Sequence, residues 1–307
     1  LRLFINNPNR RNWALVIILL GGGLGWILAI TELKNYMGSI PLDFLSPESF
    51  GFMGLFGLPH LTMARACLFW GAANYLKRDS GIGAGILWLL MGFFQPMYIL
   101  VIYVVIGFHA LAEAAWHRYQ DRSKSWSVLL RSSYLKKAFT AGLISSPFVI
   151  YTAAAMVLDD YLAAWTTQNI LPSPHWIHYL IAYGLILPFS IWGIMKLIKK
   201  NRSWGLFLAC WIVAFPFLIN APIPTQRRLA EGIWVILSIG FLGYFNGKET
   251  IPIYGKLITA LLFPTAIILL WGASLQASMP GSSPSIPVLR SQPQGRSSQK
   301  DQYMGRN

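Results

Sequence analysis

The stretch IGAGILWLLMGFFQPMYILVIYVVIGFHALA, residues 82–112, decides how many helices this chain is expected to form. It is apolar almost throughout and longer than the roughly 20 residues that one membrane span requires. Gln95 and Pro96 interrupt it, and proline cannot donate the backbone hydrogen bond that a continuous helix needs. We therefore predict two helices, 82–95 and 97–115. The first would be about 21 Å long, shorter than the roughly 30 Å hydrocarbon core, so we expect a broken or re-entrant element.

The rest of the chain has the same apolar character. Of 307 residues, 55% are hydrophobic and 12% charged, against about 25% charged in soluble domains. We predict an all-α, polytopic membrane protein with residues 1–12 as a cytoplasmic linker, 13–275 as the membrane domain and 276–307 as a disordered tail rich in Ser, Pro, Gln and Gly. The expected transmembrane or re-entrant helices are about nine: 13–30, 59–76, 82–95, 97–115, 136–157, 176–198, 204–220, 226–246 and 257–275.

The basic residues indicate the orientation. The net charge is +14, but the positive residues lie in short loops between apolar runs, a pattern of membrane topology rather than of nucleic-acid binding. With the N-terminus in the cytoplasm, seventeen Lys and Arg fall inside and three outside. Leaving 82–112 as one span would place the six basic residues of 116–137 outside, so the positive-inside rule also favours the break at Pro96.

Two of the three outer basic residues are adjacent, in APIPTQRRLAEG, residues 221–232. Pro222 and Pro224 are expected to end one span, and the next to begin near Thr225, so that Arg227 and Arg228 lie in its first turn. Free N–H groups and the positive helix dipole would point outward there, which predicts a phosphate site at the membrane surface. Glu231 is spaced to pair with either arginine. The alternative is an interfacial pair that snorkels to lipid head groups.

Further candidates lie at the same predicted face. Arg65 is inside a span, where an arginine usually faces a polar cavity or a partner, and His60 begins that span. Asp43 and Glu48 lie in the long loop 31–58, where an amphipathic interfacial helix is expected near 47–56. These acids could bind a cation or a sugar hydroxyl, or be solvated residues near a helix N-cap.

The loop 158–179 combines aromatic with hydrogen-bonding residues. Gln168, Asn169 and His175 beside tryptophans suit sugar binding and equally suit an aromatic belt. Asp159 and Asp160 are more simply interpreted as a charged helix end than as a metal or acid–base pair. Cys67 and Cys210 lie in apolar runs, so no disulfide or cysteine-based metal site is indicated. No cofactor is required by the pattern, although a divalent cation would be compatible with it.

Four blocks in order resemble a family of bacterial polytopic membrane proteins that is similar to the GT-C-fold glycosyltransferases. They are GGGLGWILAI (21–30), PLDFLSPESFGFMGLFGLPH (41–60), TTQNILPSPHWIHYLIAYGLILP (166–188) and PIPTQRRLAEGIWVILSIGF (222–241). The resemblance covers roughly 13–246. It implies an enzyme of the bacterial plasma membrane that transfers a sugar, at the outer face, from a polyprenyl-phosphate donor to a glycan, lipid or protein acceptor.

The resemblance also suggests roles for the residues above. The donor phosphate would lie near Arg227 and Arg228, with Gln226 and Arg65 beside them, and the polyprenyl tail would lie between helices among membrane lipids. In GT-C enzymes the catalytic acid usually lies in the first outer loop. Residues 1–12 look like a linker that precedes a later span, so we expect the first span and that loop to lie upstream of Leu1, and no catalytic base is assigned.

Two other functions remain open. A lipid-linked glycan flippase or other transporter would use Arg65 and the broken helix near Pro96 in a cavity at mid-depth. A non-catalytic membrane subunit is the third alternative. The candidate polar residues gather at the predicted outer face, which favours the enzyme.

Overall fold

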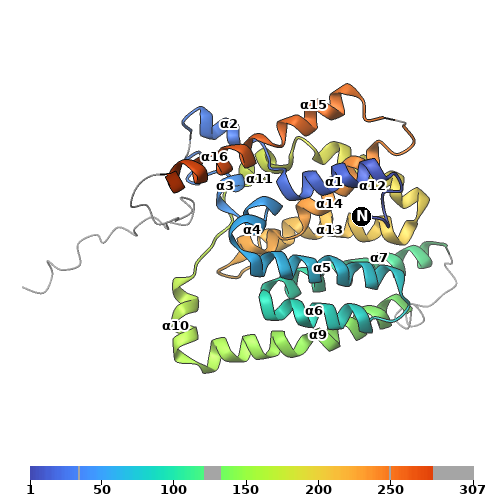
Figure 1. The fold of residues 1–307 in the computed structure, drawn as a ribbon. Coiled ribbons are helices and arrows are strands. Elements are labelled where there is room, and N and C mark those ends of the chain that lie inside the picture. The colour runs from blue at the N-terminus through green and yellow to red at the C-terminus, as the bar shows by residue number, and fades with distance from the viewer. Residues whose placement is uncertain (34, 121–132, 249, 279–307) are drawn as a thin grey trace, which may run out of the picture. The chain divides into compact units, whose positions relative to one another are not determined.

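The computed structural model describes residues 1–33, 35–120, 133–248 and 250–278. Throughout these residues the regular elements are helices, apart from one isolated bridge between Tyr36 and Ser39. The predicted all-α class is therefore confirmed (Figure 1). The chain divides into two compact units, Leu1–Ala266 and Ile267–Asn307, and the contacts and sites described below belong to the first.

The α-helices, with one 3-10 turn (η1), follow one another along the chain as α1 (Pro8–Leu20), α2 (Gly25–Ile30), α3 (Leu42–Leu45), α4 (Gly51–Gly57), α5 (Pro59–Lys77), α6 (Ile82–Phe94), α7 (Met97–Gln120), α9 (Ser133–Leu158), α10 (Asp160–Gln168), α11 (Trp176–Tyr183), α12 (Leu187–Lys200), α13 (Arg202–Ile219), η1 (Gln226–Ala230), α14 (Ile233–Tyr244), α15 (Ile253–Leu261) and α16 (Pro264–Ser278).

Several helices are long and apolar enough to cross a membrane. They are α7, α9, α13 and the segment Ile253–Ser278, with a fifth span if α11 and α12, bent by 68°, are taken together. A chain with four or five such helices suits a membrane-embedded protein. This number is lower than the nine predicted, because several of the predicted segments are shorter or broken. Residues 276–278 of the predicted tail belong to α16, and the rest of that tail, 279–307, lies outside the described residues.

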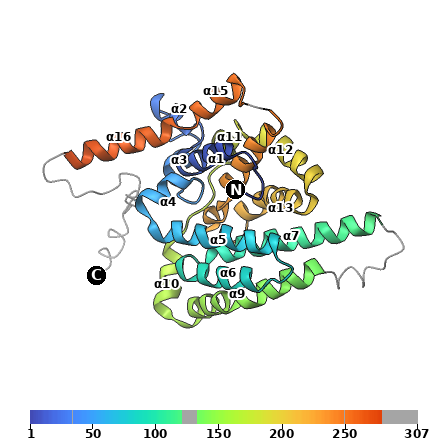
Figure 2. The same ribbon diagram turned by 45° about the vertical axis from the view of Figure 1, so that its right-hand side comes forward.

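The predicted break at Gln95 and Pro96 is confirmed, since α6 ends at Phe94 and α7 begins at Met97. Thirteen residues of α6 are too few to cross a bilayer. The helix instead packs between α5 and α9, which lie on either side of it in Figures 1 and 2. This packing covers a segment that could not span the membrane alone.

The predicted single helix over 13–30 is wrong. The structure has α1 and α2 instead, separated at Gly21–Leu24. In the gap, the Gly22 N–H donates to the Leu262 carbonyl at 2.7 Å and the Leu24 N–H to the Ile181 carbonyl at 3.1 Å. A side chain at Gly23 would meet the backbone of Ala182. Close contact with other segments therefore replaces the helical hydrogen bonds here.

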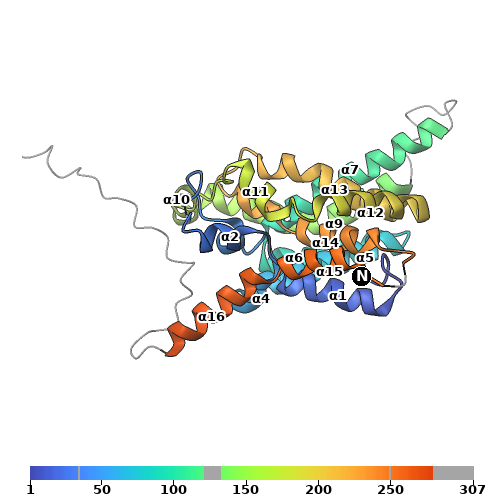
Figure 3. The same ribbon diagram turned by 90° about the horizontal axis from the view of Figure 1, so that it is seen from above.

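The centre of the first unit is α14, whose residues are buried from Ile233 through Gly243. It lies between α1 on one side and α12 and α13 on the other (Figure 3). Gly193 of α12 faces Gly240 of α14 so closely that a Cβ would collide with the opposite backbone. Small residues at this crossing let the two helices pack backbone to backbone, as they often do in membranes.

Segments expected on one side of the membrane contact one another. Contacts among the predicted outer segments join Leu171 to Pro224, His178 to Tyr36, and Arg65 to Pro47. Contacts among the predicted inner segments join Lys137 to Arg78, Arg202 to Glu113, and Lys196 to Tyr244. Each predicted set of segments thus makes polar contacts within itself.

Candidate functional site

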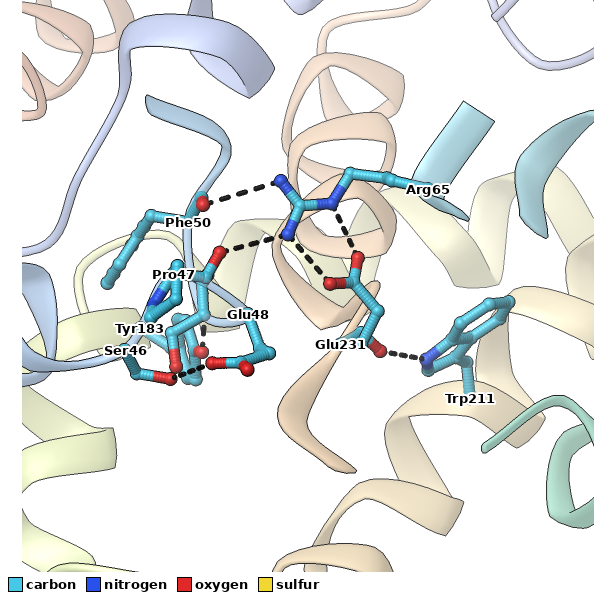
Figure 4. Close-up of polar contacts among 9 residues, drawn as sticks. Ser46, Pro47, Glu48, Phe50, Arg65, Tyr183, Trp211 and Glu231 are labelled. Carbon is cyan, nitrogen blue, oxygen red and sulfur yellow. Dashed lines mark hydrogen bonds and ion pairs between the residues drawn. The ribbon is translucent and has the colours of Figure 1, made fainter. Parts of the chain in front are cut away.

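A buried ion pair joins α5 to the turn before α14. The Arg65 Nε–H donates to Glu231 Oε1 at 2.6 Å, and an Nη2–H donates to Oε2 at 2.7 Å (Figure 4). The side chains are 13% and 0% exposed. The next residue, Gly232, has φ of +84°, a left-handed conformation that glycine adopts without strain. Gly232 thereby turns the chain into α14 and sets the position of Glu231.

The same guanidinium also binds the loop before α4. Arg65 donates to the Pro47 carbonyl at 3.0 Å and to the Phe50 carbonyl at 3.4 Å. Four of its five N–H groups are therefore used within the protein. Arg65 thus holds the loop, α5 and Glu231 together, and has little hydrogen-bonding capacity left for a ligand.

A second pair lies beside the first. The Glu48 carboxylate is buried and accepts a hydrogen bond from the Ser46 hydroxyl at 3.2 Å. Its Oε1 lies 3.8 Å from the Arg228 Nε. Burial raises the pKa of Glu48, and the charges of Arg228 and Arg227 act against that rise while Glu231 adds to it. Arg228 is thus paired with Glu48, whereas the sequence spacing allows Glu231 to pair with either Arg227 or Arg228.

Arg227 is the guanidinium with the fewest partners in this cluster. Its Nε is buried and has no hydrogen-bond partner within the described residues. Its backbone N–H donates to the Leu171 carbonyl at 3.3 Å. The cluster of Arg65, Arg227, Arg228, Glu48 and Glu231, here named the arginine cluster, therefore holds three positive and two negative side chains.

The arginine pair is not in the first turn of an α-helix, as the sequence predicts. It lies in η1, and α14 begins only at Ile233. The prolines and Gly232 isolate η1 as a separate turn, so the N–H groups and dipole of α14 do not support an anion at Arg227. The positive charge of this site comes from the guanidinium groups themselves.

The loop that contains Leu171 and Ser173 packs against the segment before η1 and holds it in place. The Leu171 N–H donates to the Pro224 carbonyl at 2.7 Å, and the Ser173 hydroxyl to the Ile219 carbonyl at 2.6 Å. The Gln226 side chain, with its amide turned to satisfy both neighbours, donates to Ala221 at 2.7 Å and accepts from Ser173 at 3.1 Å. Gln226 therefore orders the turn that carries Arg227 rather than presenting a free amide.

Asp43 lies elsewhere, enclosed by the glycines between α1 and α2. Its Oδ2 accepts hydrogen bonds from Thr265 Oγ1 at 2.9 Å and from the Gly25 N–H at 3.3 Å. Burial raises its pKa to about 6, and these hydrogen bonds oppose that rise. Asp43 is buried, its Oδ1 has no hydrogen-bond partner within the described residues, and the bonds of its Oδ2 hold the break between α1 and α2.

The other candidates are at helix ends. His60 is exposed in the first turn of α5, Gln168 ends α10, and Asn169 is the C-cap of α10. His175 caps α11, accepting from the Ile177 N–H at 3.4 Å. The charged-end interpretation of Asp159 is confirmed, because it caps α10 and accepts from the Leu162 N–H at 3.0 Å.

An apolar cavity of about 370 Å³ begins at Arg65. Arg65 and Thr62 contribute its polar groups, and the Thr62 hydroxyl is buried without a partner in the described residues. The remaining walls come from the N-terminal residues, α1, α5, α13 and α14, and include Phe4, Phe69 and Ile236. Such a cavity can hold a hydrocarbon chain beside a charged cluster.

Sequence reasoning missed the pairing of Arg65 with Glu231. A lone arginine in an apolar segment requires a buried partner, and Glu231 is one of few acids at the same predicted end. The described residues bring together no group of three His, Cys, Asp or Glu side chains that could hold a metal ion. Comparison of the chain with protein-family models, curated proteins and solved structures finds no match.

Proposed function

We propose that this protein is a membrane-embedded glycosyltransferase of GT-C type, or the carboxy-terminal part of one, with about nine transmembrane or re-entrant helices. It takes a sugar from a polyprenyl phosphate at the outer face of the bacterial plasma membrane, and its N-terminal segment lies in the cytoplasm. One observation carries the proposal: the arginine cluster holds one more guanidinium than carboxylates and adjoins, through Arg65, an apolar cavity.

Arg227 is the residue assigned to the donor phosphate. Arg65 is occupied by Glu231 and two carbonyls, and Arg228 faces Glu48. Arg227 keeps a buried Nε without a partner in the described residues. Guanidinium groups bind phosphate oxygens through charge-assisted hydrogen bonds, and the excess positive charge favours an anion. The contacts among the predicted outer segments support an outer site, since the loops expected outside meet at this cluster.

The reaction follows from this placement. An acceptor oxygen attacks the anomeric carbon, the bond from that carbon to the phosphate oxygen breaks, and the acceptor proton passes to a general base. Negative charge builds on the departing phosphate, where Arg227 and Arg228 stabilise it. The base is unassigned, because the outer loop that would carry it is expected upstream of Leu1.

A flippase is the second candidate. It would require the Arg65 guanidinium to be free to contact a substrate that passes through a cavity at mid-depth. The four hydrogen bonds of Arg65 to the protein favour the transferase. A non-catalytic subunit would share the fold but bind no sugar donor.

The test is donor binding to the protein in lipid nanodiscs. Polyprenyl-phosphate hexose is titrated against wild type, Arg227→Gln and the control Arg78→Gln, which changes a basic residue of a predicted inner segment. Loss of one charge-assisted contact of about 1.5–3 kcal/mol predicts an affinity about 10- to 150-fold weaker for Arg227→Gln alone. Equal affinities for all three proteins would exclude the assigned role.

A further inference from the structure

A second cavity, of about 500 Å³, lies between the N-terminal end of α1 and helix α15. Its polar lining includes Asn7, Arg10 and Lys256, and its apolar walls include Trp13 and Phe263. The volume is in the range of small-ligand sites, which are about 300–1,000 Å³. None of these residues belongs to the arginine cluster.

Arg10 is the central polar group of this second cavity. It is only 5% exposed, and its side-chain hydrogen bond goes to Asn246 Oδ1 at 3.5 Å, a long contact. No carboxylate among the described residues lies within ion-pair distance of Arg10 or Lys256. A buried guanidinium without a counter-charge is costly, and a bound anion would supply that charge.

More positive charge lies on α12 and on the segment between α14 and α15. Lys248 donates to the Tyr254 hydroxyl at 3.2 Å, and Lys196 donates to the Tyr244 carbonyl at 2.9 Å. Both amines also lie over the Tyr244 ring. Basic residues gathered at one end of membrane helices attract anionic lipid head groups.

The apolar walls identify the ligand as a lipid rather than a free anion. Beside the cavity, α15 exposes Ile253 and Leu257, which are 71% and 60% exposed. Trp13, 48% exposed, stands at the rim, a position typical of tryptophan at a membrane interface. A hydrocarbon chain attached to the bound anion would cover this face.

We infer that the cavity between α1 and α15 binds an anionic phospholipid, with the phosphate at Arg10 and Lys256 and an acyl chain along α15. This lipid is distinct from the proposed sugar donor and binds among the predicted inner segments. The protein would retain it in the membrane whether or not the donor site is occupied.

Native mass spectrometry of the detergent-solubilised protein tests the site. Phosphatidylglycerol is added in competition with phosphatidylcholine, and bound lipid is counted on wild type, Lys256→Gln and Arg10→Gln. Lys199→Gln is the matched control, because Lys199 is exposed at the end of α12 and does not line the cavity. Lys256 is exposed as well, so its replacement leaves folding intact even if Arg10→Gln does not fold.

We expect wild type and Lys199→Gln to retain phosphatidylglycerol in preference to phosphatidylcholine. Lys256→Gln should weaken this binding about fivefold, the effect of one basic residue near an anionic lipid surface. Unchanged binding by Lys256→Gln would overturn the assignment. Displacement of the lipid by millimolar inorganic phosphate would also overturn it, because the site would then be one for a free anion.

Discussion

Replacing Glu231 by Gln should destabilise the protein strongly while changing its shape little. The substitution removes the charge that faces Arg65 at 2.6 and 2.7 Å. Glutamine can still accept from the Arg65 Nε–H, but its amide N–H₂ would face the Nη2 donor. Breaking one side of a buried ion pair costs about 3–5 kcal/mol, because the remaining charge stays buried. The hydrogen bonds from Arg65 to the Pro47 and Phe50 carbonyls remain in the variant. We therefore expect Glu231→Gln to lower the unfolding free energy by about 3 kcal/mol, the lower end of this range.

A double-mutant cycle isolates the pair. Arg65→Gln and Glu231→Gln are each measured alone and then together, by reversible SDS unfolding in mixed micelles. The double variant buries no charge at this position, so it should lose less stability than the sum of the two single-variant losses. A coupling energy of about 2 kcal/mol is expected. Glu32→Gln, at an exposed acid, is the control and should change the unfolding free energy by less than about 0.5 kcal/mol.

The reasoning would be refuted by simple additivity of the two substitutions, or by a loss below about 1 kcal/mol for Glu231→Gln. A double-mutant cycle that shows coupling of Glu231 to Arg228 and not to Arg65 would instead support a pairing that the sequence spacing allows.

Three further results are expected. Glu113→Gln removes the negative charge that accepts a hydrogen bond from Arg202 at 2.9 Å. This change should lower the unfolding free energy by about 1–3 kcal/mol, less than Glu231→Gln because Arg202 is partly exposed. The folded-state pKa of Asp43 is raised from 3.8 to about 6, so the unfolding free energy should fall by at most about 3 kcal/mol as the pH rises through that window. Asp43→Asn should therefore flatten the dependence of the melting temperature on pH between pH 4 and 7. An unchanged slope would contradict the assignment. Gly232→Ala should cost about 1–3 kcal/mol, because φ is +84° and a Cβ would collide with Trp211; equal unfolding midpoints for variant and wild type would exclude this strain.

Local chemistry explains what the sequence predicted correctly. The break before α7 falls at Pro96, whose missing N–H removes a helical hydrogen bond, although α9 and α13 continue through Pro147 and Pro216. Composition likewise predicts an all-helical chain with membrane-length helices. Asp159 is recognisable as a helix cap for the same reason, since a cap bonds to N–H groups only three residues away.

Long-range contacts explain what the sequence did not predict. The break between α1 and α2 depends on bonds to Leu262 and Ile181, which lie far along the chain. The Arg65–Glu231 pair joins residues separated by 166 positions. Helical spacing shows which residues share a face, but it does not show which distant helix will pack there, so Glu231 was assigned to its near neighbours in sequence.

The central claim is that the arginine cluster receives the phosphate of a polyprenyl-linked sugar. Photo-crosslinking tests it most directly, using a donor that carries a diazirine on the isoprene unit next to the phosphate. After irradiation in nanodiscs and peptide mapping, the account predicts adducts within 62–69 and 224–231. Adducts confined to the α1–α15 cavity, or their absence from both segments at saturating donor, would contradict it.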